Sequence, residues 1–268
     1  MLFDSHTHLE SPRFQADREA VILRAREAGV GRMVTCGSDL ATSRACLALA
    51  EAHAGVYAAV GIHPHEARSA ATVAGDETSL HEAAFVELAT LAGREGVVAL
   101  GEMGLDYHYA FSLRPAQRAV LARQLELAAH VGLPVILHNR ESDEDFRQVI
   151  EAGPQGLRGV LHCFLADAAL AEWALARGLY LGMAGPITFR NVTHLDGIVR
   201  AMPRERLLIE TDCPYLAPQP KRGRRNEPAY VRHVAEHVAR LWGASFEEVA
   251  RQTTANANRL FGLDAHGR

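Results

Sequence analysis

Two histidines lie one residue apart near the start of the chain, where His6 and His8 belong to the segment MLFDSHTHL. Side chains two positions apart on a β-strand point to the same side, so both imidazoles can reach one point, whereas a helix would separate them. Imidazole is a common metal ligand, but it also has ordinary structural roles, and this chain contains 14 histidines. The pair therefore indicates a metal site only if other ligands reach the same place.

Residues able to bind a metal also follow other short apolar runs of the chain. These runs end in the motifs GIHPH, GEMGLDYH, ILHNR, LHCF and ETDCP. The candidate ligands in these motifs are His63, His65, Glu102, Asp106, His138, His162, Glu210 and Asp212. A single such residue is readily explained as a helix cap or a packing group, but recurrence at six of eight runs is not.

The apolar runs alternate with longer amphipathic segments, which is the pattern of βα units around a parallel sheet. Eight strands are predicted, at Leu2–His6, Met33–Cys36, Tyr57–Gly61, Val97–Gly101, Pro134–His138, Gly159–His162, Leu179–Met183 and Leu207–Glu210. Helices are predicted at Ala16–Ala28, Leu40–Ala52, Leu80–Leu91, Pro115–Val131, Asp167–Arg177, Ala229–Trp242 and Ser245–Phe261. The last two helices are expected to pack on the outside of the sheet.

This pattern predicts an α/β fold, a closed (β/α)8 TIM barrel, which typically needs about 250 residues. No Pro/Ser-rich linker interrupts the 268 residues, so we expect a single domain over residues 1–268. An open doubly wound sheet is the alternative, because periodicity alone does not separate the two. In a barrel all strands end at the face that carries active sites, so ligands far apart in sequence would meet there.

The types of the candidate ligands indicate the chemistry. If each of the six runs contributes one ligand, the site has four imidazoles, two carboxylates and no thiolate. Such a ligand set suits divalent ions such as Zn²⁺, Mn²⁺ and Mg²⁺. Six ligands exceed what one tetrahedral ion needs, so we expect two ions that share a carboxylate. Two neighbouring ions can activate a water molecule and polarise a phosphoryl or carbonyl oxygen, which predicts a hydrolase.

The composition limits the binding partners and the cellular compartment that we expect. The net charge is −4 and the pI is about 6.4, so a polyanion would need a local basic patch, such as Lys221-Arg222-Gly223-Arg224-Arg225. The four cysteines are scattered and form no CxxC pair, which argues against a disulfide framework. Neither a secretory signal nor a membrane-spanning apolar stretch is evident. We expect a cytoplasmic protein without membrane association.

Seven motifs in order resemble the TatD family of metal-dependent deoxyribonucleases, a branch of the amidohydrolase-like barrels. They are HTHL, GIHPH, GEMGLDYH, ILHNR, LHCF, ETDCPYL and RGRRNEP. The resemblance runs from Asp4 to about Phe261 and includes ANANRLFGL. It implies 3′-5′ exonuclease hydrolysis of phosphodiester bonds.

The resemblance also implies a distribution of ligands, and this sequence departs from it at none of the six positions. His6, His8 and Asp212 would hold one ion, His138 and His162 the second, and Glu102 would bridge them. Asp212 would take the proton of the attacking water, so Asp212 and Glu102 are catalytic candidates.

Other polar residues are candidates for contacts with substrate. His63 is expected to hydrogen-bond a phosphate or protonate the leaving oxygen, which also makes it a catalytic candidate, and His65 either shares that role or fixes the loop. Asp106 either orients a ligand histidine or caps a helix, and Asp4 is expected to pack inside the barrel.

Phosphate contacts are expected from Arg222, Arg224 or Arg225. Loop aromatic residues could stack bases or simply pack locally: Tyr107, Tyr109, Phe111, Phe164 and Tyr215.

Three functions remain open from sequence. The first is a nuclease with two divalent ions, acting on DNA ends as a monomer with no obligate protein partner. The second is the same metal chemistry on a small phosphoester, a cyclic amide or the ester of a D-aminoacyl-tRNA. The third is a binding or scaffold protein with a structural metal. The complete ligand set argues against the third, and the basic loop with Glu102 in place of a lysine argues against cyclic amides.

Overall fold

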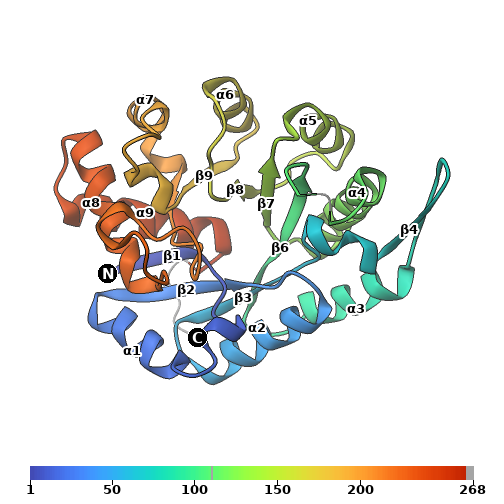
Figure 1. Ribbon diagram of the computed structural model, residues 1–268, viewed down its shortest axis with the longest axis horizontal. Coiled ribbons are helices and arrows are strands. Elements are labelled where there is room, and N and C mark those ends of the chain that lie inside the picture. Colours follow the sequence, from blue (N-terminus) through green and yellow to red (C-terminus); the bar gives the residue numbers. More distant parts are fainter. Residues whose placement is uncertain (110, 264–268) are drawn as a thin grey trace. The chain divides into compact units, whose positions relative to one another are not determined.

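The computed structural model describes residues 1–109 and 111–263, in which strands and helices alternate along the chain (Figure 1). Residues 264–268 of the predicted domain lie outside this description. The chain divides into two compact units. We call Cys36–Val160 the central unit, and Met1–Thr35 with Leu161–Arg268 the terminal unit.

Three parallel strands form the sheet of the central unit, in the order β3, β6, β7. They span Val56–Val60, Val97–Asp106 and Val135–Arg140. The helices of this unit are α2 (Leu40–Ala52), α3 (Glu82–Ala92), α4 (Arg114–Val131) and α5 (Asp143–Ala152). β6 is buried at all ten positions, as expected of an inner parallel strand that is covered on both faces.

β6 continues to Asp106, five residues beyond its predicted end at Gly101, because two glycines allow a close approach to β7. A Cβ at Gly101 would lie 2.7 Å from the carbonyl oxygen of Ile136. A Cβ at Gly104 would lie only 1.8 Å from the carbonyl oxygen of His138. The extension pairs Gly104 with His138 and Asp106 with Arg140, so β6 and β7 carry their polar residues side by side.

A β-hairpin that the sequence analysis missed precedes α3. β4 (Ala71–Ala74) and β5 (Glu77–Leu80) pair antiparallel, and Leu80, the predicted first residue of a helix, ends β5. A two-residue Gly-Asp turn flanked by β-branched residues was the available signal, and Gly75 has the positive φ, 61°, that such turns favour. The hairpin packs against α4, and Figure 1 shows it projecting beside α3.

The terminal unit contains both ends of the described chain. β1 (Leu2–Thr7) pairs with β2 (Val30–Cys36) and β9 (Tyr180–Met183) pairs with β10 (Leu207–Ile209), all in parallel. The unit boundary lies within β8 (Gly159–Leu161) and just before Cys36. The helices are α1 (Arg18–Glu27), α6 (Ala168–Ala176), α7 (His194–Ala201), α8 (Val231–Trp242) and α9 (Phe246–Phe261).

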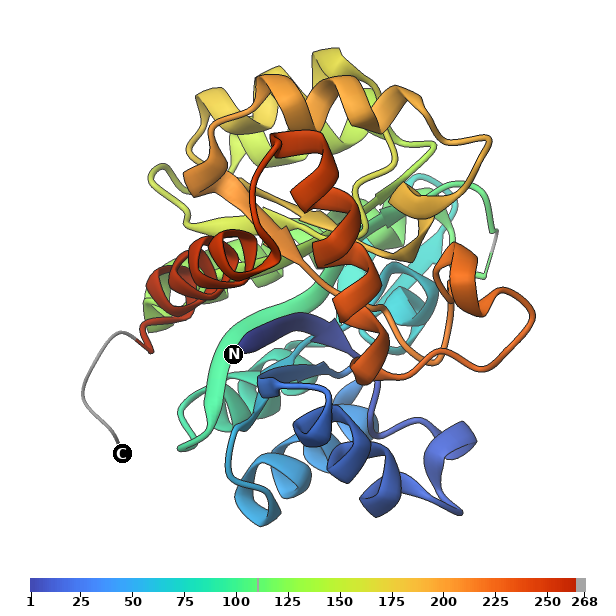
Figure 2. The same cartoon turned by 90° about the vertical axis from the view of Figure 1, so that its left-hand side faces the viewer.

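The first strand and the last helix pack together in this unit, as Figure 2 shows for dark blue β1 and red α9. The rings of Phe3 and Phe261 stack with centroids 5.8 Å apart. α9 begins at a capping box in which Ser245 and Glu248 satisfy each other's backbone amides. Burial of aromatic surface therefore ties the two ends of the sequence to each other.

All eight predicted strands are present within residues 1–109 and 111–263, mostly with ends shifted by a few residues. The same residues contain no helix that is both long and apolar enough to cross a membrane.

Candidate metal centres

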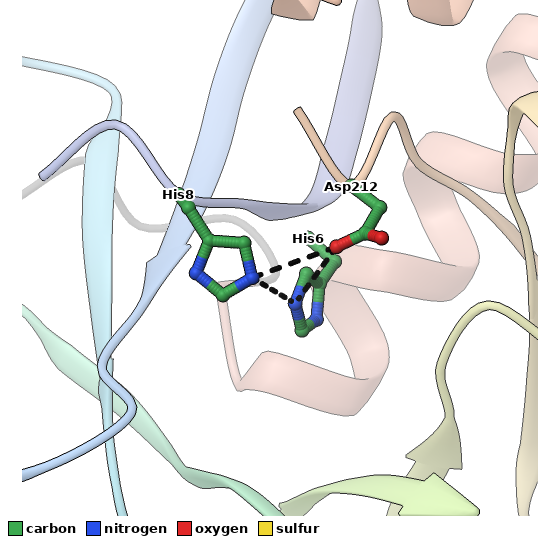
Figure 3. A group of neighbouring side chains, drawn as sticks. All are labelled: His6, His8 and Asp212. Carbon is green, nitrogen blue, oxygen red and sulfur yellow. Dashed lines mark hydrogen bonds and ion pairs between the residues drawn. The ribbon is translucent and has the colours of Figure 1, made fainter. Parts of the chain in front are cut away.

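His6, His8 and Asp212 form one group of potential ligands, and Figure 3 shows their side chains pointing toward one another. The Nε2 atoms of His6 and His8 are 3.3 Å apart. The Oδ1 atom of Asp212 lies 3.7 Å from Nε2 of His6 and 3.5 Å from Nε2 of His8. All three residues are nearly inaccessible to solvent. We call this set the terminal donor group.

Main-chain hydrogen bonds fix the spacing of the terminal donor group. The amide of Asp212 donates to the carbonyl oxygen of His6 (3.0 Å), and the amide of His8 donates to the carbonyl oxygen of Cys213 (2.8 Å). Asp212 has a φ of 56°, in the left-handed region that aspartate tolerates better than most residues. The backbone therefore turns just after β10 and presents the carboxylate to the two imidazoles.

The charge state of Asp212 suits this position. Burial alone would raise the pKa of the carboxyl, but the hydrogen bond with His8 and the neighbouring imidazoles outweigh burial and lower the pKa. Asp212 is therefore an anion near neutral pH, as a ligand carboxylate must be.

Asp4 supports the same segment, a role that its interpretation as packing overlooked. Its Oδ1 accepts a hydrogen bond from the amide of Thr211 (2.9 Å), and its Oδ2 accepts one from the Thr211 hydroxyl (2.6 Å). Asp4 is fully buried, and burial raises the pKa of its carboxyl well above the ordinary value. The side chain joins β1 to the residue that precedes Asp212.

Glu10 is a second partner that the sequence analysis missed. Its Oε1 lies 3.3 Å from Nδ1 of His8, and its Oε2 accepts a hydrogen bond from the Thr35 hydroxyl (2.8 Å). The carboxylate orients the His8 ring, and with a cation at Nε2 it would accept the proton carried by Nδ1. An acidic residue two positions after a ligand histidine was the only sequence signal.

The central unit holds a second group, formed by His63, Glu102 and His138. The Oε1 atom of Glu102 is 2.9 Å from Nδ1 of His138 and 3.2 Å from Nε2 of His63. Glu102 lies on β6 and His138 on β7, so the pairing of these strands brings them together. We call this set the central donor group.

His63 was expected to face the substrate, and the structure places its Nε2 among potential ligand atoms. Burial lowers the pKa of His63 to about 4, although the charge of Glu102 partly offsets that effect. The imidazole is therefore neutral at pH 7 and able to offer a lone pair. Sequence spacing does not distinguish a ligand from a substrate contact here, because both require a side chain at a strand end.

Asp106 contacts two histidines, as one of its two predicted roles requires, but it caps no helix of the described chain, because α4 begins eight residues later at Arg114. Its Oδ2 lies 3.2 Å from Nε2 of His138 and 3.0 Å from Nε2 of His65, while its Oδ1 accepts hydrogen bonds from the amides of His108 and Tyr109. Burial alone would raise the pKa of Asp106, but hydrogen bonds from His138 and His65 outweigh burial and hold the pKa well below its ordinary range. With a cation between Nδ1 of His138 and Glu102, this carboxylate would hold the proton of His138 on Nε2.

His162 lies in the terminal unit, just after β8. Its ring stacks on that of His6, with centroids 4.0 Å apart, and its Nδ1 lies 3.5 Å from Oε1 of Glu210. Glu210 also accepts hydrogen bonds from the amide of Cys163 (2.5 Å) and the hydroxyl of Ser5 (3.1 Å). Glu210 directly follows β10 and lies beside His162.

The donors fit divalent metal ions. Within each donor group the candidate atoms lie within 4.8 Å of one another, and they are imidazole nitrogens and carboxylate oxygens. Such donors suit Zn²⁺, Mn²⁺ or Mg²⁺. Buried carboxylates and imidazoles at this spacing are also expensive to assemble unless a cation or a proton compensates them.

The three arginines expected to contact phosphate differ in their surroundings. Arg225 forms an ion pair with Asp17 (2.6 Å) and lies over the ring of Phe14. Arg222 is exposed and lies 4.3 Å from the ring centroid of Phe189, and Arg224 is exposed as well. Arg222 and Arg224 therefore present cationic groups to solvent, whereas Arg225 fixes its loop to the segment before α1.

Comparison with known proteins identifies the family. A family model described as TatD related DNase matches residues 3–262. YabD of Bacillus subtilis strain 168, named as a metal-dependent hydrolase, is 41% identical over 265 residues, which cover 98% of this chain and 100% of the relative. TatD of Erwinia amylovora, named as a 3′-5′ ssDNA/RNA exonuclease, is 40% identical over 269 residues, with the same coverage.

A solved structure confirms the predicted fold. YJJV, a TatD homologue from Escherichia coli K12, has a TM-score of 0.87 and 29% identity, and the match covers 97% of this chain and 98% of that chain. The (β/α)8 barrel expected from the alternation of strands and helices is therefore correct. The expected enzyme class, a metal-dependent hydrolase, is confirmed as well. The chain belongs to the TatD-related DNase family.

Proposed function

We propose that the protein is a nuclease that uses divalent metal ions to remove nucleotides from the 3′ end of single-stranded DNA. The observation that carries the proposal is the pair of buried donor groups at His6, His8 and Asp212 and at His63, Glu102 and His138. A relative that is 40% identical over 269 residues is named as an exonuclease, which supports a phosphodiester bond as the bond that is hydrolysed. RNA ends are a second substrate of the same reaction.

We infer two ions per subunit, with Mg²⁺, Mn²⁺ or Zn²⁺ as candidates. His6, His8 and Asp212 would hold one ion, His138 and His162 the other, and Glu102 would bridge them. When bound, the ions would make a water molecule more acidic and polarise a phosphoryl oxygen. His63 has its Nε2 beside Glu102, so it either completes the second ligand set or hydrogen-bonds the phosphate.

The remaining steps belong to side chains of this chain. Asp212 would accept the proton of the attacking water, because hydrogen bonding keeps its carboxylate ionised. His65 would hydrogen-bond a phosphate oxygen, since its half-buried ring is oriented by Asp106. Arg222 and Arg224 would bind the backbone phosphates, and Arg225 would position their loop.

We also infer that both units form one domain, which acts as a cytoplasmic monomer without an obligate protein partner. The match of one family model across residues 3–262 supports the single domain. The four cysteines are scattered along the sequence and form no CxxC pair, which supports a reducing compartment. All proposed ligands come from one chain, which supports a monomer.

The test is metal-dependent cleavage of a 5′-labelled single-stranded oligonucleotide, read as a product ladder. We expect stepwise shortening from the 3′ end with Mg²⁺ or Mn²⁺ and none with excess EDTA. Glu102→Gln and Asp212→Asn should lower kcat by on the order of 100-fold or more, because they alter proposed metal ligands. His130→Ala, at an exposed position on α4, is the control and should leave kcat unchanged.

Two results would overturn the proposal. One is intact DNA and RNA in the presence of protein whose metal content is verified. The other is hydrolysis of a small phosphoester or of aminoacyl-tRNA at rates far above those for oligonucleotides, which would assign the same metal chemistry to another ester.

A further inference from the structure

An exposed pair of stacked aromatic rings lies in the loop between β6 and α4. The rings of Tyr109 and Phe111 are nearly parallel, at 6°, with centroids 5.3 Å apart. Their residues are 41% and 54% exposed, although most large apolar side chains of the described chain are buried. We call these two residues the aromatic pair.

The aromatic pair is held in place by residues of the central unit. The ring of His65 meets both rings edge-on, with centroid distances of 5.5 Å to Tyr109 and 4.9 Å to Phe111. The amide of Tyr109 donates to Oδ1 of Asp106 (3.0 Å). Phe111 is tied through its carbonyl oxygen, which accepts a hydrogen bond from Arg68 (3.4 Å). The rings and their backbone are therefore contacted by partners on several segments despite their exposure.

The same residues connect the aromatic pair to the central donor group. Asp106 holds both the amide of Tyr109 and Nε2 of His138, and the rings of His65 and His138 are 6.5 Å apart. One imidazole therefore separates the exposed rings from a proposed metal ligand. A nucleic acid strand bound with its scissile phosphodiester bond at His138 would have a neighbouring nucleotide next to the aromatic pair.

The charge around the aromatic pair favours a nucleic acid. The guanidinium of Arg140 lies 4.9 Å from the ring centroid of Tyr109, and Arg68 is close to Phe111. Arginines beside exposed aromatic rings match the alternation of phosphates and flat bases along a single strand. An apolar protein partner that covered the rings would remove water from both guanidinium groups without offering them hydrogen-bond acceptors, which is unfavourable.

We propose that Tyr109 and Phe111 form a stacking platform for a base of the single-stranded substrate, next to the bond that is cleaved. The proposal rests on the nuclease function and adds the way in which the strand is held. Stacking requires only the flat face of a base, so the platform should accept all four bases and discriminate against a missing one.

The test compares Tyr109→Ala, Phe111→Ala and Phe111→Leu with the parent on a single-stranded oligonucleotide and on its abasic analogue. Loss of one stacked base typically weakens binding by about 5- to 150-fold, so we expect a KM at least 5-fold higher with little change in kcat. The abasic analogue should show no difference between variants and parent. Phe111→Tyr should recover most of the affinity that Phe111→Leu loses, because it restores the ring.

Leu113→Ala is the matched control, because Leu113 is 63% exposed on the same loop but has no ring. Its KM should equal that of the parent. A KM unchanged in Tyr109→Ala and Phe111→Ala, or raised equally on the abasic analogue, would overturn the platform. An equal rise in Leu113→Ala would do so too, because it would indicate a general apolar surface such as a protein-docking site.

Equilibrium binding separates this inference from the nuclease proposal. An oligonucleotide with 2-aminopurine near its 3′ end should lose fluorescence on binding the parent and not on binding the Tyr109→Ala/Phe111→Ala variant. Quenching without cleavage would retain the platform and reject the nuclease. Cleavage without quenching would do the reverse, and absence of binding would reject both.

Discussion

A single carboxylate sets the chemical form of a proposed ligand in the central unit. Asp106 faces Nε2 of His138, so Nδ1 of the same ring is left to face Glu102. Asp106 therefore holds the His138 ring with Nδ1 toward Glu102, although it shares neither strand nor loop with His138. Such partners commonly change metal affinity by about 10- to 100-fold.

We predict that Asp106→Asn lowers the affinity for Mn²⁺ by about 10- to 100-fold, because the amide no longer fixes the His138 tautomer. Isothermal titration of the metal-free protein measures the change. Asp196→Asn is the control, since Asp196 contacts His237 in a similar pair (3.1 Å) away from both donor groups. Equal affinities for the parent and Asp106→Asn would show that the tautomer is set elsewhere.

The sequence indicated which residues could be ligands better than it indicated their atoms. His6, His8 and Asp212 could be related because strand ends share one face of a barrel. The orientation of each ring depends on the conformation of Glu10, two residues after His8, and on Asp106, which lies on a different strand from His138. The position of His63 beside Glu102 depends on a loop conformation that no periodicity describes.

At the level of elements, the approach of β6 to β7 determines the spacing of the central donor group. Gly104 faces the carbonyl oxygen of His138 so closely that no side chain fits between them. The absence of one Cβ therefore controls the distance between the strand of Glu102 and the strand of His138.

We predict that Gly104→Ala destabilises the protein by about 4 kcal/mol and weakens metal binding, because the added Cβ forces β6 and β7 apart. Urea unfolding measures the change. Gly132→Ala is the control: Gly132 has a φ of 72°, but a Cβ added there would meet nothing within 4 Å, so only the backbone conformation is penalised, by about 1 kcal/mol. Similar losses for the two variants would mean that the close approach is not needed.

The strands were predictable because apolar runs of this length between helices have few alternatives. The β4–β5 hairpin was not recognised because half of its strand residues are polar and only one is buried, so it lacked the apolar signal of the other strands. The extension of β6 past Gly101 was also missed, because glycine normally weakens a strand. Here Gly101 and Gly104 instead allow β6 to continue close to β7.

At the level of the whole molecule, metal binding should contribute to stability. Clustered anionic carboxylates and neutral imidazoles repay part of their burial cost when a cation joins them. A ligand that binds only the folded state stabilises it by about 2.7 kcal/mol at 100 times its Kd.

We therefore predict that Mn²⁺ at 100 times its Kd raises the Tm of the metal-free protein by about 5 °C or more. Differential scanning calorimetry with and without EDTA measures the shift. The Asp212→Asn variant should respond less, because one donor of the terminal group is neutral. A Tm independent of saturating Mn²⁺ would contradict the assignment of the donor groups.

The residues of the two donor groups are synthesised at different stages of translation. His63, Glu102 and His138 belong to one uninterrupted stretch, Cys36–Val160, and are all synthesised before β10. His6 and His8 emerge first of all, yet they must wait for Asp212, and β1 must wait longer for the packing of α9. A nascent or truncated chain that stops before Asp212 has two imidazoles without their carboxylate. Under the proposed function, a chain can therefore gain nuclease activity only after its synthesis has passed Asp212.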